Sequence, residues 1–174
     1  LGIIGNTGHS FGKHLHFSLL KIDERKSINP FLILPKVKDS KKPKISNFYI
    51  KVGKKYYVIN NNTKIRLTRH YPLLVSIIDS IKKNERLGIF KLKAIFNRKT
   101  VMDVMFSDID FSKNGLTIDN NKYNDLLDVK GYYKVKDMTY KQGLNRLKII
   151  AKDFYGNIST KEVSFNVKLE IAQD

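Results

Sequence analysis

The strongest constraint on the fold is the alternation of apolar and polar residues in short runs along most of the chain. In the clearest run, Val163, Phe165 and Val167 alternate with polar neighbours, and similar runs begin at Phe48 and Ile65. Successive side chains of a β-strand point to opposite faces of the sheet, so this period of two predicts strands with one buried face. The pattern favours an all-β chain.

Clusters of turn-forming residues separate these runs, as expected for many short strands. They lie at residues 52–54, 60–62, 97–99, 114–115 and 155–157. Asn and Gly accept the positive φ angles that such turns require, and short strands joined in this way favour two packed sheets. We therefore expect a β-sandwich, with one mixed region: a short helical turn at residues 123–127 and a strand at residues 132–135.

A lysine-rich segment divides the chain. Between Pro35 and Lys44 there are five lysines, one aspartate and two prolines, a composition that cannot form a core and favours an extended linker. The sequence thus predicts an N-terminal part at residues 1–35, a linker at residues 36–44 and a β-sandwich domain at residues 45–174.

Composition excludes several classes of site. The chain has no cysteine, which excludes disulfide scaffolds and thiolate metal sites, so any metal must be bound by histidines and carboxylates. The longest apolar run, at residues 71–78, is too short to span a membrane. We expect no transmembrane segment here. The first residues have neither an initiator Met nor a secretory signal, so the chain is expected to start internally.

A histidine pair concentrates the chemistry near the N-terminus. In a strand, His14 and His16 share one face while Leu15 and Phe17 share the other. Imidazole suits zinc, and a catalytic zinc site leaves room for a second imidazole to act on the metal-bound water. The bare spacing is weak evidence, because such a pair also arises by chance.

A glycine-rich turn leads directly into this pair. Residues 5–13 contain three glycines, as expected of a loop that presents its backbone close to a metal-bound substrate. A phosphate-binding loop is the other interpretation, but no helical pattern follows that would supply a helix N-terminus.

Four features carry a resemblance to a known family. They are Gly-Asn-Thr-Gly-x-Ser at residues 5–10, Gly12, His-Leu-His-Phe at residues 14–17, and Asn29-Pro30 followed by Leu34-Pro35. They resemble the C-terminal end of the LytM/lysostaphin-type zinc peptidases, whose signature reads G-N-T-G-x-S-T-G-P-H-L-H-F and then N-P. The expected fold is the last strands of that antiparallel β peptidase domain, followed by an immunoglobulin-like β-sandwich.

The resemblance implies roles for these residues. It makes His16 a zinc ligand and His14 the catalytic base or transition-state stabiliser. The activity implied is hydrolysis of peptide bonds in peptidoglycan, in the periplasmic or extracytoplasmic part of the bacterial cell envelope. The substrate loop is formed by Asn6, Thr7, Gly8, Ser10 and Gly12.

The sequence departs from the family pattern in two ways. Phe11, Lys13 and Ser18 stand where the family usually has Thr, Pro and Glu, which affects loop shape and substrate preference but not zinc binding. The family's other ligands come from an H-x-x-x-D motif that we expect upstream of Leu1, and His70 lacks the following Asp. We therefore expect these residues alone to be inactive, because one or two histidines cannot hold a catalytic zinc tightly.

The last hairpin offers a further candidate site. Residues 147–167 resemble the final hairpin of bacterial immunoglobulin-like modules, which contains a D-x-x-G-N turn. Asp153, Asp108 and Asp110 suggest calcium, since oxygen ligands suit that ion. Turn chemistry favours the simpler interpretation that Asp153 and Asn157 bond the turn backbone.

The charge lies away from the histidines. The chain carries +17, of which residues 1–35 contribute only +2, leaving +15 beyond. Nucleic-acid binding is disfavoured because lysines are scattered and arginines are few, although five tyrosines are available for stacking on bases. Those tyrosines are Tyr49, Tyr56, Tyr57, Tyr132 and Tyr133. Compositional drift explains the charge best, followed by attraction to an anionic envelope surface.

Two further functions stay open at this point. One is a non-catalytic LytM-type regulator of a cell-wall hydrolase, which retention of His14 and His16 argues against. The other is a basic β-sandwich that binds an anionic polymer, whose affinity would fall steeply with salt.

Overall fold

The computed structural model describes residues 18–35, 38–81, 87–112 and 115–170. Nearly all regular structure there is β, which confirms the predicted all-β class. The elements are β1 (Leu19–Lys21), β2 (Lys26–Ile28), the 3-10 turn η1 (Pro30–Leu32), β3 (Lys44–Val52), β4 (Lys55–Ile59), β5 (Lys64–Leu67), β6 (Leu73–Ile78), β7 (Lys91–Phe96), β8 (Lys99–Met105), β9 (Asp108–Ser112), β10 (Gly115–Ile118), β11 (Asn121–Lys122), α1 (Tyr123–Leu126), β12 (Tyr133–Val135), β13 (Gly143–Lys152) and β14 (Ile158–Leu169).

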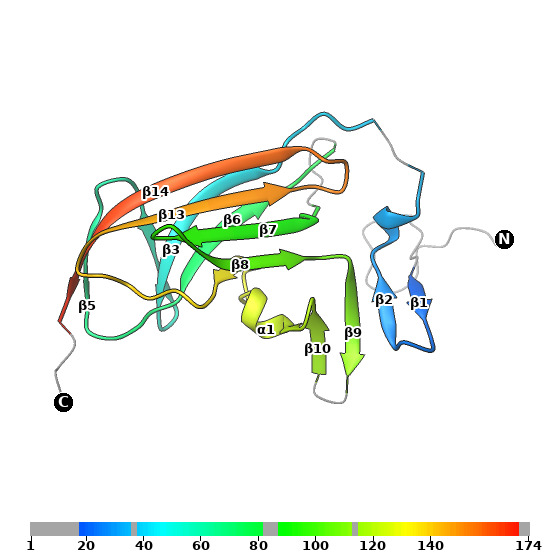
Figure 1. Cartoon of the computed structure of the whole chain (residues 1–174), viewed down its shortest axis with the longest axis horizontal. Helices are drawn as coiled ribbons and strands as arrows, with labels where there is room; N and C mark the ends of the chain where they lie inside the picture. Colours follow the sequence, from blue (N-terminus) through cyan, green and yellow to red (C-terminus); the bar gives the residue numbers. More distant parts are fainter. Residues whose placement is uncertain (1–17, 36–37, 82–86, 113–114, 171–174) are drawn as a thin grey trace.

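Two sheets form the sandwich. One has the strand order β12-β6-β3-β4, and the other has the order β5-β14-β13-β7-β8 (Figure 1). All of their strand pairs are antiparallel except β5 with β14, which run parallel. The apolar side chains of both sheets meet in one hydrophobic core.

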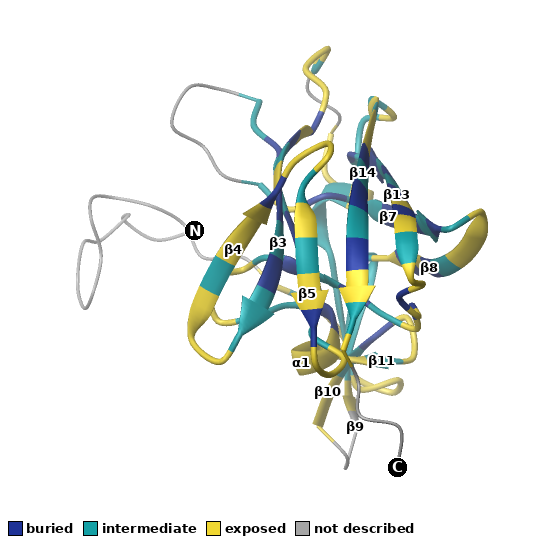
Figure 2. Cartoon of the chain, turned by 90° about the vertical axis from the view of Figure 1, so that its left-hand side faces the viewer, coloured by how far each residue is buried: buried dark blue, intermediate teal, exposed yellow. Residues whose placement is uncertain are grey.

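The alternation in the sequence marks the faces of these strands. Val163, Phe165 and Val167 of β14 are buried, while Ser164 and Asn166 between them are only half-buried. The same alternation along β14 and β3 is visible in Figure 2. The predicted strands therefore follow from one physical rule, the burial of every second side chain.

Most of the predicted turns also occur in the structure. Positive φ angles occur in all five predicted clusters, at Gly53, Asn62, Asn97, Gly115 and Gly156. The mixed region likewise agrees with expectation, because α1 lies within the predicted helical turn at residues 123–127 and β12 within the predicted strand at residues 132–135.

A third sheet joins the N-terminal segment to the sandwich. Its order is β1-β2-β9-β10-β11, and β2 pairs antiparallel with β9 over three residue pairs. The hairpin β1–β2 thus shares backbone hydrogen bonds with a strand that lies about eighty residues later in the chain. The segment that follows the predicted histidine motif is therefore attached to the C-terminal module directly, and not only through residues 36–44.

Within the described residues, none of the helices is long and apolar enough to cross a membrane.

Replacing Phe165 with Ala should destabilise the sandwich by about 3–5 kcal/mol, because it removes a large buried ring and leaves a cavity. Phe165 has no exposed surface and packs against Phe96 and Tyr140, with ring centroids 6.5 and 6.4 Å away. Urea unfolding measures the change. As a control, Thr160→Ala on an exposed position of the same strand should change stability by less than about 0.5 kcal/mol; equal losses in both variants would contradict the assigned core.

Candidate functional site

The residues that the sequence assigns to catalysis and zinc binding lie outside the described part of the chain. Their roles and the zinc site stay predictions. They are His14, His16, Asn6, Thr7, Gly8, Ser10 and Gly12.

The segment just after this motif is described, and it is held firmly against the end of the sandwich. Asn29 caps η1, accepting the backbone N–H of Phe31 at 3.1 Å, and its own N–H donates to the carbonyl of Ser107 at 2.8 Å. The Phe31 ring packs against Phe154 and Tyr155, at centroid distances of 5.4 and 6.3 Å. The Asn-Pro pair thus fixes where the chain leaves the N-terminal hairpin.

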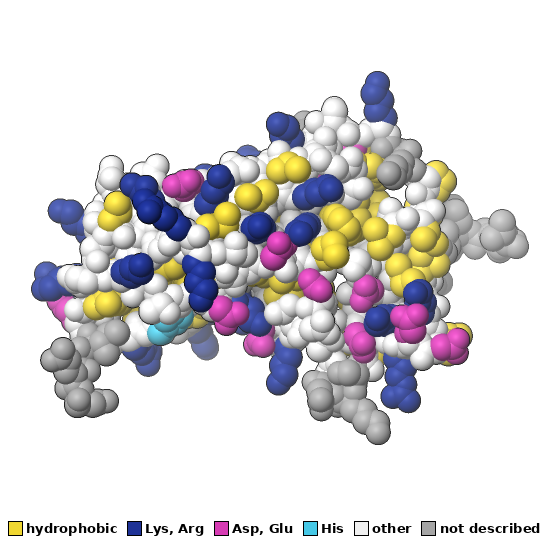
Figure 3. Space-filling model, viewed as in Figure 1, with side chains coloured by type: hydrophobic (Ala, Val, Ile, Leu, Met, Phe, Trp, Pro, Cys, Tyr) yellow, Lys and Arg dark blue, Asp and Glu magenta, His cyan; other side chains and the backbone are white. Residues whose placement is uncertain are grey.

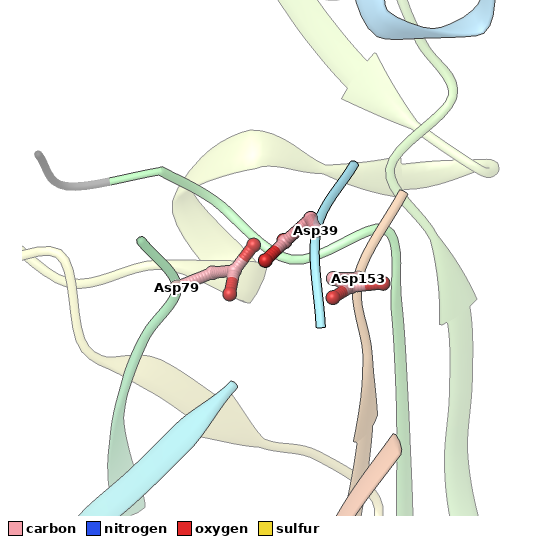
Figure 4. A group of neighbouring side chains, drawn as sticks. All are labelled: Asp39, Asp79 and Asp153. Carbon is pink, nitrogen blue, oxygen red and sulfur yellow. The ribbon is translucent and has the colours of Figure 1, made fainter. Parts of the chain in front are cut away.

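Three carboxylates converge near the same end of the molecule. Asp39 lies between η1 and β3, Asp79 follows β6, and Asp153 follows β13. One oxygen from each lies within 4.8 Å of the others, and Figure 4 shows the side chains of Asp39 and Asp79 pointing toward one another with Asp153 beside them. Among the described residues this is the one group of three or more potential ligands close enough to share a metal ion.

The turn after β13 fixes Asp153 in place. Its Oδ1 accepts the backbone N–H groups of Tyr155 and Asn157, both at 2.8 Å, and its Oδ2 accepts the side-chain amide of Asn157 at 2.7 Å. The prediction that Asp153 bonds the turn backbone is therefore confirmed, whereas the side chain of Asn157 donates to Asp153 and not to the turn backbone. The same amide also donates to the backbone carbonyl of Asp39 at 3.2 Å, so Asn157 links two of the three segments.

Two carboxylate oxygens of this cluster are buried without a partner. Within the described residues, Asp79 Oδ1 and Asp39 Oδ2 accept no hydrogen bond, although Asp39 Oδ1 accepts the N–H of Lys41 at 2.9 Å. The described part of the chain also contains no Lys, Arg or His nitrogen within 4.0 Å of the three carboxylates. Burial first, and then the charges of Asp153 and Asp39, raise the pKa of Asp79 to about 6.

The sequence indicated only one member of this cluster. Asp39 lies in the lysine-rich segment, which the sequence indicates only as a linker. Asp79 follows an apolar run, which predicts a buried strand but no ligand. Asp108 and Asp110, the other carboxylates suggested by the sequence, lie on β9 and do not join the cluster; Asp108 accepts the hydroxyl of Ser107 at 2.7 Å.

The tyrosines form a second cluster, on the outer face of β3 and β4. Tyr49 stacks on Tyr132 with a centroid distance of 4.9 Å and an angle of 8°, and Tyr56 meets both rings edge-on. Lys130 lies 4.3 Å from the ring centre of Tyr56, whose hydroxyl donates to Asp128. The rings therefore pack on one another, and Tyr133 of the predicted stacking set is buried instead.

Basic side chains are spread over the face of the described residues that Figure 3 shows. Figure 3 shows Lys and Arg side chains scattered over one face, with acidic side chains among them. Ion pairs such as Lys91–Asp103, at 2.8 Å, neutralise part of this charge. His70, which has no assigned role, bonds the carbonyl of Met138 at 2.9 Å through Nε2.

Asp79→Asn should stabilise the metal-free chain near neutral pH. Because the pKa of Asp79 is raised from 3.8 to about 6 in the folded chain, folding favours its protonated form. This contribution is complete below about pH 4 and is lost as the pH rises through about 6. Urea unfolding in EDTA should therefore give Asp79→Asn a higher midpoint than the native chain at about pH 8.

The same comparison at about pH 4 supplies the control for this prediction. There the native carboxyl is mostly protonated, so the advantage of Asn should shrink. An advantage that does not change with pH, or a loss of stability at pH 8, would contradict the electrostatic assignment.

One of the comparisons with known proteins covers the region of the sandwich. None of the curated proteins compared matches the chain. A family model for a domain of unknown function matches residues 42–168, which run from just before β3 into the last strand, β14. This match covers well over half of the chain, and the chain therefore belongs to that family of domains of unknown function.

Proposed function

We propose that residues 1–35 are the C-terminal end of a LytM/lysostaphin-type zinc metallopeptidase domain and that residues 45–174 form a β-sandwich module that follows it. The complete protein would hydrolyse peptide bonds of peptidoglycan in the bacterial cell envelope, periplasmic or extracytoplasmic. The observation that carries the proposal is the motif at residues 5–17, in which a glycine-rich turn leads directly into His14-Leu15-His16-Phe17.

The two histidines fit distinct parts of that reaction. Bound zinc would polarise the scissile carbonyl and acidify a water molecule. His16 would supply one of the metal's nitrogen ligands, and His14 would accept the water proton or stabilise the oxyanion. Two histidines provide the right donor type but too few ligands, and in the family that the motif resembles the other ligands come from an H-x-x-x-D motif.

The structure of the following segment supports this proposal. β1 begins at Leu19, three residues after His16, and its hairpin continues into β2, which pairs with β9. The Asn29 cap and the ring contacts of Phe31 then attach the segment to the sandwich. A module anchored this close to the histidine pair would orient the catalytic part, as well as act as a spacer.

A second candidate function is a basic module that binds an anionic polymer of the cell envelope. The cluster of Tyr49, Tyr56 and Tyr132 with Lys130 favours it, because it combines half-buried aromatic rings with a cation over one of them. Binding of this kind depends on charge and not on zinc.

The affinity of the chain for an anionic wall polymer should therefore fall by at least about tenfold between 50 and 200 mM salt, and it should be unchanged by EDTA. A salt-independent affinity would contradict this second function.

In the complete protein, His16→Ala should lose both bound zinc and peptidoglycan hydrolysis, because it removes a metal ligand. His14→Ala should keep zinc while hydrolysis falls by about 10²–10⁴-fold, because it removes only proton transfer or oxyanion stabilisation. Metal analysis by mass spectrometry and release of soluble wall fragments measure the two properties separately.

His70→Gln is the matched control for these variants. Its side chain bonds the carbonyl of Met138 in the sandwich, and Gln retains a donor for this contact. It should leave zinc content and hydrolysis unchanged. Full zinc content in His16→Ala would refute the ligand assignment, and full activity in His14→Ala would refute the catalytic one. A complete protein without zinc or hydrolysis would instead favour the non-catalytic regulator.

A further inference from the structure

We propose that Asp39, Asp79 and Asp153 form a calcium site that ties the segment between η1 and β3 to the ends of β6 and β13. This proposal does not depend on the peptidase assignment, because all three residues lie outside the histidine motif.

The positions of the oxygens suit one shared ion. Calcium holds its oxygen ligands at about 2.4 Å, so two ligands of the same ion lie at most about 5 Å apart. One oxygen from each of the three carboxylates falls within 4.8 Å of the others. The three come from segments that are distant in sequence, so the packing of the sandwich brings them together (Figure 4).

Besides the short distances between the carboxylates, two buried oxygens that lack a hydrogen-bond partner among the described residues indicate a ligand. Asp79 is only 2% exposed, and its side chain points toward Asp39 (Figure 4). Its buried Oδ1 has no hydrogen-bond partner among the described residues. Asp39 Oδ2 is a second buried oxygen in the same state. Buried carboxylates are normally paired with a cation or fully hydrogen-bonded, because the loss of hydration is otherwise uncompensated. A bound cation would satisfy both oxygens at once.

The donor set identifies the kind of cation. Only carboxylate oxygens converge there among the described residues, whereas zinc prefers sites with nitrogen or sulfur ligands. Magnesium usually retains several waters and takes one or two carboxylates, while calcium accepts about six to eight oxygens in a flexible arrangement. Asp153 has lone pairs left for such a role, because its Oδ2 accepts only the Asn157 amide.

A bound ion would fix the lysine-rich segment between η1 and β3 to the sandwich. Lys38 and Lys41 beside Asp39 are exposed, while Pro43 is buried at the start of the sandwich. Hydrogen bonds to backbone carbonyls already bring the three segments together, from the Asn157 amide to Asp39 and from the Lys41 ammonium to Ile81, but neither donor reaches a carboxylate oxygen left without a partner. The ion would add the missing positive charge and fix this connection to the sandwich.

The first test is thermal unfolding of the 174-residue chain after treatment with EDTA. Adding calcium chloride to a few millimolar should raise the midpoint by about 5 °C or more, because the ion binds only the folded chain. Magnesium chloride at the same concentration should have a smaller effect. No shift with calcium in the native chain would overturn the proposal.

Two variants locate the effect. Asp79→Asn removes one ligand and is expected to fold well without metal, so it should lose the calcium response; Asp39→Asn should do the same. Asp125→Asn removes an equal charge at an exposed position in α1 and should respond like the native chain. A calcium shift in Asp79→Asn as large as that of the native chain would place binding elsewhere and overturn the site.

The second test follows the connection itself by cleavage with a lysine-specific endoproteinase. Calcium should slow cleavage after Lys38 and Lys41 in the native chain and in Asp125→Asn, but not in Asp79→Asn. Mass spectrometry of the fragments identifies the cleaved bonds. Equal cleavage rates with and without calcium in the native chain would refute the proposed fixing of this segment.

Discussion

The pairing of β13 with β14 is the interaction on which the rest of the sandwich depends. These two long strands run antiparallel over ten residue pairs, from Gly143 opposite Val167 to Lys152 opposite Ile158. Each also supports a neighbour, because β14 pairs with β5 and β13 pairs with β7. A slip of one residue in this hairpin would turn Phe165 and Leu147 away from the core, so their burial fixes the register of the whole sheet.

The turn of this hairpin also determines where the carboxylate of Asp153 lies. Asp153 stabilises the turn by accepting two backbone N–H groups, and this requires a buried carboxylate at the end of β13. The same turn brings Asn157 against the backbone of Asp39. Once Asp153 is fixed, the packing of β6 places Asp79 beside it, and the repulsion among these carboxylates is a consequence of the fold. A cation is one solution, and protonation of Asp79 is the other.

The sequence predicts what depends on local rules and misses what depends on long-range packing. Alternation identified β14 and β5, and the D-x-x-G-N run predicted the bonds of Asp153, because each signal lies within a few neighbouring residues. The pairing of β2 with β9 joins segments about eighty residues apart and leaves no local signal. Asp39 and Asp79 were missed for the same reason. The histidine motif is also a local signal, but it consists of residue types at fixed spacing and not of an alternating pattern. The prediction of a zinc site there rests on the sequence alone.

The N-terminal hairpin and the carboxylate cluster act on the same connection. Between β2 and β3 the chain is held at one end by the pairing with β9 and the Asn29 cap, and at the other by buried Pro43. Asp39 lies between these two attachments, among exposed residues. A bound ion there would add a further attachment to the strand pairing, the Asn29 cap and the ring contacts of Phe31. Because β1 begins only three residues after His16, an ion at Asp39 that fixes this connection would also influence how rigidly the hairpin next to the proposed catalytic segment is held on the sandwich.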